Sequence, residues 1–186
     1  GNRREVARSL NYLGAVAYQR GEYATARDFF QESLRLSQEA GDLHGTARAL
    51  NSLGSVAYTL GDYEQARQAY RDSLSYCREL GDHYGISRAL NNLGAVAYLM
   101  GEHEQARQLH QECLTIKREI GDRRGVAFSL SNLGYVAYLQ EDYPAARQLL
   151  LESLAVFGEV GDPSGLASAL DYLGHTMLAL GREREA

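Results

Sequence analysis

Three kinds of side chain that can bind a polypeptide recur at a fixed spacing in this chain. Arg8, Arg48 and Arg88 lie 40 residues apart, and each is followed by an asparagine three residues later and a tyrosine ten residues later. A guanidinium binds a carboxylate through two parallel hydrogen bonds, and an asparagine amide both donates to and accepts from a peptide backbone. A tyrosine adds a flat apolar face with a polar tip. Side chains of these three types are together suited to binding an extended peptide.

Residue types that carry catalysis or bind metals do not form a motif. No two of the five histidines have the i, i+4 spacing of a helical metal site, and the histidines and cysteines together do not form a complete ligand motif. The glycines follow the 40-residue spacing instead of clustering into a phosphate-binding loop, and no Gly-Lys-Ser/Thr occurs. We therefore expect no enzyme, no catalytic residue, no metal and no cofactor.

Composition excludes further classes. The net charge of −5 does not favour nucleic acid, and neither a membrane-spanning apolar run nor a signal-peptide pattern is visible. The two cysteines, Cys77 and Cys113, have no paired spacing, so we expect reduced thiols. These features indicate a cytoplasmic protein that does not contact membranes.

The whole chain repeats with a period of 40 residues. Leu-Gly recurs at 13–14, 53–54, 93–94, 133–134 and 173–174, and Gly-Asp recurs at 41–42, 81–82, 121–122 and 161–162. A fixed period of this length is typical of solenoids, in which each unit buries its apolar face only against its neighbours. We expect one array over residues 1–186, with repeats at about 2–41, 42–81, 82–121 and 122–161 and a partial repeat at 162–186. Since the last repeat breaks off, we also expect the chain to be a segment of a longer protein.

Each repeat is predicted to form two helices. In the second repeat these are residues 43–60 and 63–80, because Gly41 and Gly61 suit the left-handed position after a helix and the following aspartates suit an N-cap. Pro163, at the first helical position after Asp162, supports this placement. Both segments are amphipathic at 100° per residue, and the short turn makes them antiparallel. The fold class is therefore all-α, a solenoid of stacked antiparallel helix pairs.

These residues resemble a known family. Leu50, Leu53-Gly54, Tyr58, Gly61-Asp62-Tyr63, Ala66 and Tyr70, with their equivalents in the other repeats, resemble the tetratricopeptide repeat. The 40-residue unit is similar to that of Pins/LGN-type adaptors and of sensor arrays in bacterial signalling ATPases and transcription regulators. The resemblance implies a right-handed superhelix in which the first helix of each repeat lines the concave wall and the second lies outside.

The polar face of the first helices is then the candidate site for a protein or peptide partner. In Pins/LGN-type adaptors, Arg and Asn on these helices hold acidic peptides, which implies the same role for the arginines and asparagines here. Phe128 and Ser168 stand where the arginine is lost, so we expect acidic partner residues towards the N-terminal repeats and an apolar anchor at Phe128, Tyr135 and Tyr138. The predicted partner-binding residues are Arg8, Asn11, Tyr18, Arg48, Asn51, Ser55, Tyr58, Arg88, Asn91, Tyr98, Phe128, Tyr135 and Tyr138.

The pattern leaves alternatives open. Each arginine can pair with an acid of the next repeat or lie in solvent, the asparagines can bond to one another, and the tyrosines can be half core. At the level of function, the alternative is a ligand-sensing array in a larger signalling ATPase or transcription regulator. A third possibility is self-association through the last helix, which exposes Leu170, Leu173, Met177 and Leu180.

One turn departs from the pattern. Glu141 stands where the other first helices end in glycine, and a left-handed non-glycine residue costs about 1 kcal/mol. We therefore expect a different turn geometry in the fourth repeat.

Overall fold

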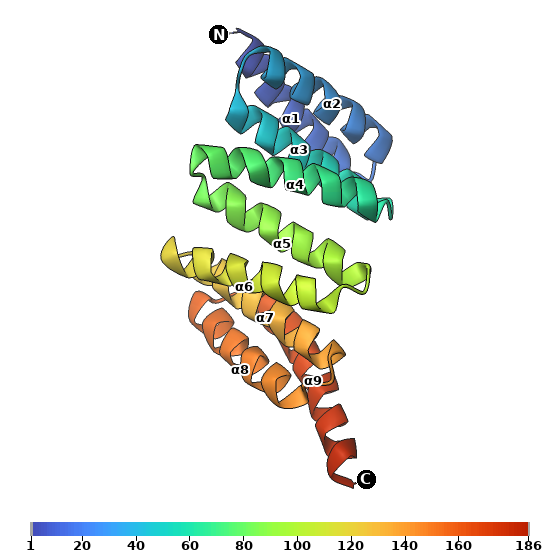
Figure 1. The fold of residues 1–186 in the computed structure, drawn as a ribbon, viewed down its shortest axis with the longest axis vertical. Helices are drawn as coiled ribbons and strands as arrows, with labels where there is room; N and C mark the ends of the chain where they lie inside the picture. Colours follow the sequence, from blue (N-terminus) through green and yellow to red (C-terminus); the bar gives the residue numbers. More distant parts are fainter. Residues whose placement is uncertain (1, 186) are drawn as a thin grey trace. The chain divides into compact units, whose positions relative to one another are not determined.

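The computed structural model of this protein describes residues 2–185, including side chains as far as residue 181. Gly1 and Ala186, at the ends of the predicted array, lie outside the described residues. In the described part the chain is all-helical (Figure 1). The helices, in pairs joined by short turns, are α1 (Asn2–Gln19), α2 (Tyr23–Glu39), α3 (Leu43–Thr59), α4 (Tyr63–Leu80), α5 (His83–Leu99), α6 (His103–Glu119), α7 (Arg123–Leu139), α8 (Tyr143–Val160) and α9 (Pro163–Glu185).

The helices form two compact units, one that ends at Val96 and one that begins at Ala97. In the first unit α1 packs on α2, α3 packs on α4, and α2 also contacts α3. In the second unit α7 lies between α6 and α8, and α9 contacts both α7 and α8. Within each unit, neighbours in sequence are therefore neighbours in space, as expected for a solenoid of antiparallel pairs.

The repeat junctions are built as the sequence predicts. Asp42 and Asp62 are N-caps, and their carboxylates accept hydrogen bonds of 3.0 Å from the backbone N–H groups of Gly45 and Gln65. Gly81, after α4, is left-handed with φ 64° and caps that helix. The predicted range 43–60 is one residue longer than α3, and the predicted range 63–80 coincides with α4.

Within a repeat, a glycine on the first helix receives a large side chain from the second. A Cβ atom on Gly54 would lie 2.6 Å from the ring of Tyr70, and one on Gly134 would lie 2.7 Å from Leu150. Next to this contact, the Ser73 hydroxyl donates a 2.8 Å hydrogen bond to the buried carbonyl of Ala47. Ser33 and Ser153 repeat this bond to Ala7 and Ala127 at 2.7 Å and 2.8 Å.

Between repeats, a second glycine contact joins the second helix to the following first helix. A Cβ on Gly45 would lie 2.5 Å from the Ser37 hydroxyl, and one on Gly165 would lie 2.2 Å from the ring of Phe157. Phe157 also belongs to the main apolar core of the second unit, with Leu130 and Leu133. This position is occupied by the small Ser37 in the first repeat and by the large Phe157 in the fourth, while the glycine opposite it is the same in both.

Filling the Gly54 gap is expected to destabilise the protein. Gly54→Ala adds a methyl group against a ring that is only 3% exposed, and overpacking of about 1–3 kcal/mol outweighs a gain in helix propensity of about 1 kcal/mol. Denaturant unfolding should show a loss of about 1–2 kcal/mol. Gly158→Ala is the matched control, because a Cβ there meets nothing within 4 Å, and it should stabilise the protein. A Gly54→Ala protein as stable as Gly158→Ala would contradict this packing argument.

The expectation of a different turn at Glu141 is wrong. Glu141 has φ 61°, within the range of 60° to 82° for the turn glycines. The bonds of the turn are also kept, since the Glu141 and Asp142 N–H groups donate to Tyr138 and Ala137 at 3.0 Å. Packing of the two helices therefore holds this residue in a strained backbone conformation.

Removing that strain should stabilise the protein. Glu141→Gly relieves about 1–2 kcal/mol of left-handed strain and costs about 0.4–1 kcal/mol through the freer unfolded chain. We expect a net gain of about 0.5–1 kcal/mol in the unfolding free energy, with an unchanged denaturant slope. The reverse change at an equivalent turn, Gly61→Glu, should lower stability by a similar amount. Equal stabilities of the three proteins would show that the turn is not strained.

The last helix departs from the repeat pattern. Gly181 stands in the register of the turn glycine Gly61, but α9 continues through it to Glu185. In the described part of this repeat no second helix packs against the first. No tertiary contact then offsets the free energy of breaking the helix at Gly181, and the helix propagates.

Candidate functional site

The predicted site residues lie on the first helices of the repeats. In the first unit they come from α1, α3 and the part of α5 that ends at Val96, and in the second from the end of α5 and from α7. The two sets are described separately below.

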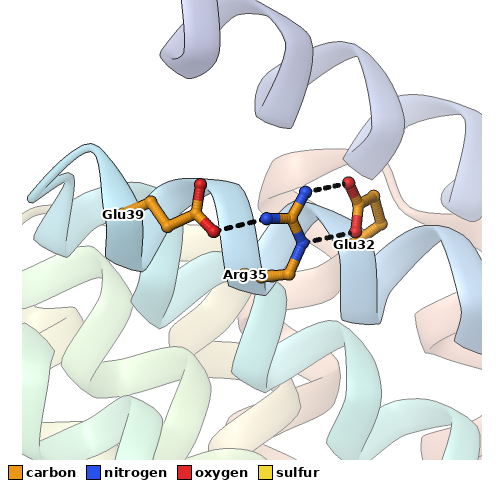
Figure 2. Close-up of polar contacts among 3 residues, drawn as sticks. All are labelled: Glu32, Arg35 and Glu39. Carbon is orange, nitrogen blue, oxygen red and sulfur yellow. Dashed lines mark hydrogen bonds and ion pairs between the residues drawn. The ribbon is translucent and has the colours of Figure 1, made fainter.

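The two arginines Arg48 and Arg88 are half-buried, and the Nε atom of each is buried without a hydrogen-bond partner. Among the described residues neither forms an ion pair. The alternative in which each arginine pairs with an acid of the next repeat therefore does not hold for these two positions. Several arginines on second helices do form ion pairs. Figure 2 shows Arg35 on α2 held between Glu32 and Glu39, and Arg67 and Arg107 pair in the same way with Glu64 and Glu104.

Arg8 and Arg48 share a hollow of about 290 Å³ at the N-terminal ends of α1 and α3. The remaining lining residues are Arg4, Glu5, Asp42 and His44. Arg4 uses one guanidinium nitrogen to donate to the Ala40 carbonyl at 3.3 Å. The three arginines outnumber the two carboxylates, so the hollow suits an anionic group of a partner. The sequence analysis did not predict Arg4 or His44 as site residues. Each stands four residues before a predicted arginine, Arg8 or Arg48, and this spacing places it on the same face of the helix.

The asparagines are placed differently from the main prediction. Asn11 and Asn51 are 6% and 7% exposed. Asn11 donates to the Ser52 hydroxyl at 3.5 Å, and the Asn51 side-chain oxygen accepts from Asn92 at 3.2 Å. For these two residues the structure shows the alternative in which the amides join neighbouring helices. Asn91 is half-buried, and its role toward a partner stays a prediction.

A second hollow of about 250 Å³ in the first unit is rich in hydroxyl groups. Tyr18, Ser55 and Tyr58 line it, as predicted for the site, together with Tyr70, Asn92 and Ala95. The Tyr70 hydroxyl donates to Ser55 at 3.2 Å, and burial raises the pKa of Tyr70 to about 12. The Tyr70 hydroxyl therefore remains neutral at physiological pH. The hydroxyl groups that line the hollow can exchange hydrogen bonds with a peptide backbone.

In the second unit the first helices carry a cluster of tyrosines. The Tyr98 and Tyr135 hydroxyls are 3.2 Å apart, and the Tyr135 ring stacks on Tyr172 with centroids 4.5 Å apart. Tyr138 stacks on the same ring at 6.2 Å. The hydrogen bond with Tyr98, together with burial, raises the pKa of Tyr135 to about 12. Tyr172 was missed from the sequence, although it stands 80 residues after Asn92 in the same register.

Phe128 does not contact this cluster through its ring. It is 37% exposed and packs edge-on against Phe157 with centroids 4.9 Å apart. Arg124 lies over the ring at 5.5 Å and donates to Asp162 at 2.6 Å. Phe128, one of the three residues of the predicted apolar anchor, therefore packs within the protein. It lies two helical turns before Tyr135.

The tyrosines that follow the turns within each repeat have a structural role. Tyr23, Tyr63 and Tyr143 pack against Tyr18, Tyr58 and Tyr138 with centroid distances of 5.5, 6.0 and 5.7 Å. They hold the ends of the site helices and are not part of the site.

A tetratricopeptide repeat model matches residues 5–79, 56–119, 85–159 and 125–186. The chain belongs to the tetratricopeptide repeat family. The four matches together reach from the second helical turn of α1 to the end of the chain, so the family assignment covers both units.

Solved structures with the same fold are distant in sequence. BtubC (BKLC) from P. vanneervenii is 20% identical with a TM-score of 0.85, over 96% of this chain and 74% of that one. Aspartyl phosphate phosphatase F from Bacillus subtilis is 14% identical with a TM-score of 0.88, over 97% of this chain and 49% of that one. A putative kinesin light chain repeat array from Podosopora anserina is 13% identical with a TM-score of 0.80, over 100% and 91%. At these identities the likeness concerns the fold. No curated protein sequence matches significantly.

None of the helices in the described range is both long enough and apolar enough to span a lipid bilayer.

Proposed function

We propose that this tetratricopeptide repeat protein binds a partner polypeptide on the first-helix faces, with acidic partner side chains at Arg8 and Arg48. The observation that carries the proposal is the unpaired state of the Arg48 and Arg88 Nε atoms. A half-buried guanidinium without an acid partner loses hydrogen bonds to water and regains none within the protein. A carboxylate from a partner would supply them in bidentate geometry.

The composition of the two units supports a partner with two chemically different parts. The hollow beside Arg48 holds more positive than negative side chains. The cluster of Tyr98, Tyr135, Tyr138 and Tyr172 offers ring faces and hydroxyl tips, which suit apolar side chains and peptide carbonyls. An acidic segment at the first unit and an apolar segment at the second fit these two surfaces.

Similar proteins provide a second line of support. Tetratricopeptide repeats generally bind proteins. A Rap protein whose structure was determined in complex with competence and sporulation factor has the same fold, with 16% identity and a TM-score of 0.80.

Peptide display tests the proposal without a known partner. A random peptide library selected on the wild-type chain should be enriched in Asp and Glu, and the enrichment should disappear in the Arg8→Glu, Arg48→Glu double variant. Affinity of the selected peptides should fall about 10-fold or more for the variant, since charge-assisted contacts contribute about 1.5–3 kcal/mol each. Arg71→Glu, an exposed arginine on α4, is the charge-matched control. Equal selection by all three proteins would refute the proposed acidic specificity.

Asn51→Ala is not a suitable test of binding. Asn51 accepts the hydrogen bond from Asn92 and is 7% exposed, so its loss would weaken the contact of α3 with α5 even if it touches no partner.

A second candidate function is an effector-sensing array within a larger signalling protein. The chain spans about half the length of the Rap and phosphatase structures that it resembles, which is the observation that favours this candidate. An ATPase or DNA-binding region encoded next to this segment in the same gene would support it.

A further inference from the structure

A hollow of about 280 Å³ opens in the first unit, on the side of α3 that faces away from the proposed peptide site. Its floor is apolar and belongs to α3, and its walls come from α2 and α4. At 100° per residue the floor lies roughly opposite to Arg48 and Tyr58 on the same helix. A partner in this hollow therefore does not compete directly with one on the first-helix face. The floor residues are Leu53, Val56, Ala57 and Leu60.

The floor is more open here than at the equivalent place in the next two repeats. Leu60 is 54% exposed. Leu53 is half-buried, whereas Leu93 and Leu133, which occupy its register, are 5% and 3% exposed. Apolar side chains left open beside a hollow mark an interaction surface.

Ala69 on α4 lines one wall of the hollow, and it is the small member of its register. The preceding and following second helices carry Phe29, Leu109 and Leu149 at this position. Each of these three side chains is partly buried and packs against an apolar core cluster. The protein therefore fills this position with a leucine or phenylalanine of its own in three repeats, and in the second repeat it leaves room for one from outside.

Arg27 stands at the rim of the hollow without an acidic partner. Arg67 and Arg107, at the same register, form ion pairs with the glutamates three residues earlier. In the first repeat that position is Ala24, and within the part of the chain that the structure describes Arg27 forms no ion pair. Its guanidinium can bind a carboxylate of a partner through two parallel hydrogen bonds.

The rest of the rim is polar. The Asp62 carboxylate accepts a 3.0 Å hydrogen bond from the Gln65 N–H group and caps α4, so the N-terminal end of that helix offsets its charge. The side chains of Gln31 and Gln65 also line the hollow, and their amides can donate to and accept from a partner backbone. An apolar floor inside a polar rim is the arrangement that buries a single anchor side chain at a protein interface.

We infer that this hollow is a docking site for a protein segment that inserts a leucine or phenylalanine side chain and places a neighbouring carboxylate on Arg27. The small side chain of Ala69 sets the size of the anchor, and the free charge of Arg27 sets the charge beside it. An occupant would cover the open parts of Leu53 and Leu60. The inference does not depend on the function proposed above, because the two surfaces lie on different faces of α3.

Peptide selection on a protein that lacks the proposed acidic site tests the inference. A random library is selected on the Arg8→Glu, Arg48→Glu double variant, which does not retain peptides that need those two arginines. We expect enrichment in Leu and Phe with Asp or Glu beside them. Adding Ala69→Leu should remove this enrichment and weaken the selected peptides at least about 10-fold, because the new leucine occupies the hollow. Absence of the enrichment, or its persistence after Ala69→Leu, would overturn the inference.

Gln68→Leu is the matched control for the filled hollow. It adds the same side chain at the adjacent, exposed position on α4, and it should leave the selected peptides bound. The unfolding midpoint of the Ala69→Leu protein should not fall below that of its parent, since Leu109 and Leu149 are accommodated at this register. Equal loss of binding in the Gln68→Leu protein would mean that the hollow is not the site.

Arg27→Glu tests the charge at the rim and leaves the apolar floor intact, so it serves even if the Ala69→Leu protein fails to fold. Peptides selected on it should keep the Leu or Phe anchor but carry Lys or Arg in place of the neighbouring acid. Arg71→Glu, at an exposed position on α4 that does not line the hollow, should keep the acidic preference. An acidic preference that survives Arg27→Glu would refute the assigned role of Arg27.

Analytical ultracentrifugation identifies a second copy of this chain as the occupant if there is one. We expect the wild-type chain and the Ala69→Leu protein to have the same association state. Self-association that Ala69→Leu abolishes would show that another copy fills the hollow, and it would overturn the assignment to a different protein.

Discussion

Replacing Phe157 with alanine is expected to lower the free energy of unfolding by about 3–5 kcal/mol. Phe157 is 1% exposed, and its ring lies against Gly165, where no Cβ would fit. It also packs edge-on against Phe128 at 4.9 Å. The three atoms nearest to a Cβ on Gly165 all belong to the Phe157 ring, so the loss includes both the transfer of the ring and the space that it leaves empty. Chemical denaturation followed by circular dichroism measures the change.

A double-mutant cycle with Gly165 identifies the contact responsible. Gly165→Ala alone should destabilise the protein, because its Cβ would lie 2.2 Å from the Phe157 ring. In the Phe157→Ala background the same methyl group enters vacated space and should be neutral or stabilising. Leu151→Ala, at an exposed position on α8, should change stability by less than about 0.5 kcal/mol. Additive effects of the Phe157 and Gly165 changes would rule out the ring-on-glycine contact as their cause.

Acid is expected to destabilise the protein through one buried histidine. His110 on α6 is 2% exposed, and its Nδ1 atom has no hydrogen-bond partner. Burial, with a smaller effect of the Lys117 charge, lowers the pKa of His110 to about 4. An unfolded histidine binds a proton near pH 6.5, so between pH 6.5 and 4 the unfolded state holds more protons than the folded state. Stability therefore falls as the pH falls through this window, by about 2 kcal/mol at pH 5 and about 3 kcal/mol at pH 4.

His110→Leu provides the comparison, because Leu150 occupies the equivalent position in the fourth repeat. Denaturation midpoints measured from pH 7 to pH 4 should fall more steeply for the wild type than for the variant. Effects of pH on groups other than His110 are common to both proteins and cancel in the difference. Parallel pH profiles for the two proteins would mean that His110 is protonated in the folded state as readily as in the unfolded one.

Much of the fold could be predicted from the sequence because its determinants are local. Asp42 and Asp62 cap helices with their own carboxylates, and the glycines at the turns tolerate a left-handed backbone. These are properties of a few neighbouring residues, repeated at each period. The prediction failed at Glu141, where packing outweighed local preference, and the repeat pattern is broken at Gly181, where no packing enforces a turn.

The candidate site was predictable only in part. Helical periodicity correctly assigned Arg48, Ser55 and Tyr58 to accessible faces of a first helix. It could not distinguish Asn51 from them, since that amide is buried by its contact with a residue 41 positions later. Tyr172 was missed for the same reason: its stacking on Tyr135 depends on which helices become neighbours.

The sequence by itself determined the helical repeats, the junctions between them and the register that puts arginine, asparagine and tyrosine on the first helices. Those features follow from hydrogen bonds and side-chain spacing within one segment. Only the tertiary structure decided which side chains remain available to a partner. It leaves Arg48 without an acidic partner and places Asn11 and Asn51 in hydrogen bonds between helices. It also leaves Leu170 and Leu178 exposed on α9. Pairing and burial depend on side chains brought together from distant repeats, and a pattern along one chain does not contain those distances.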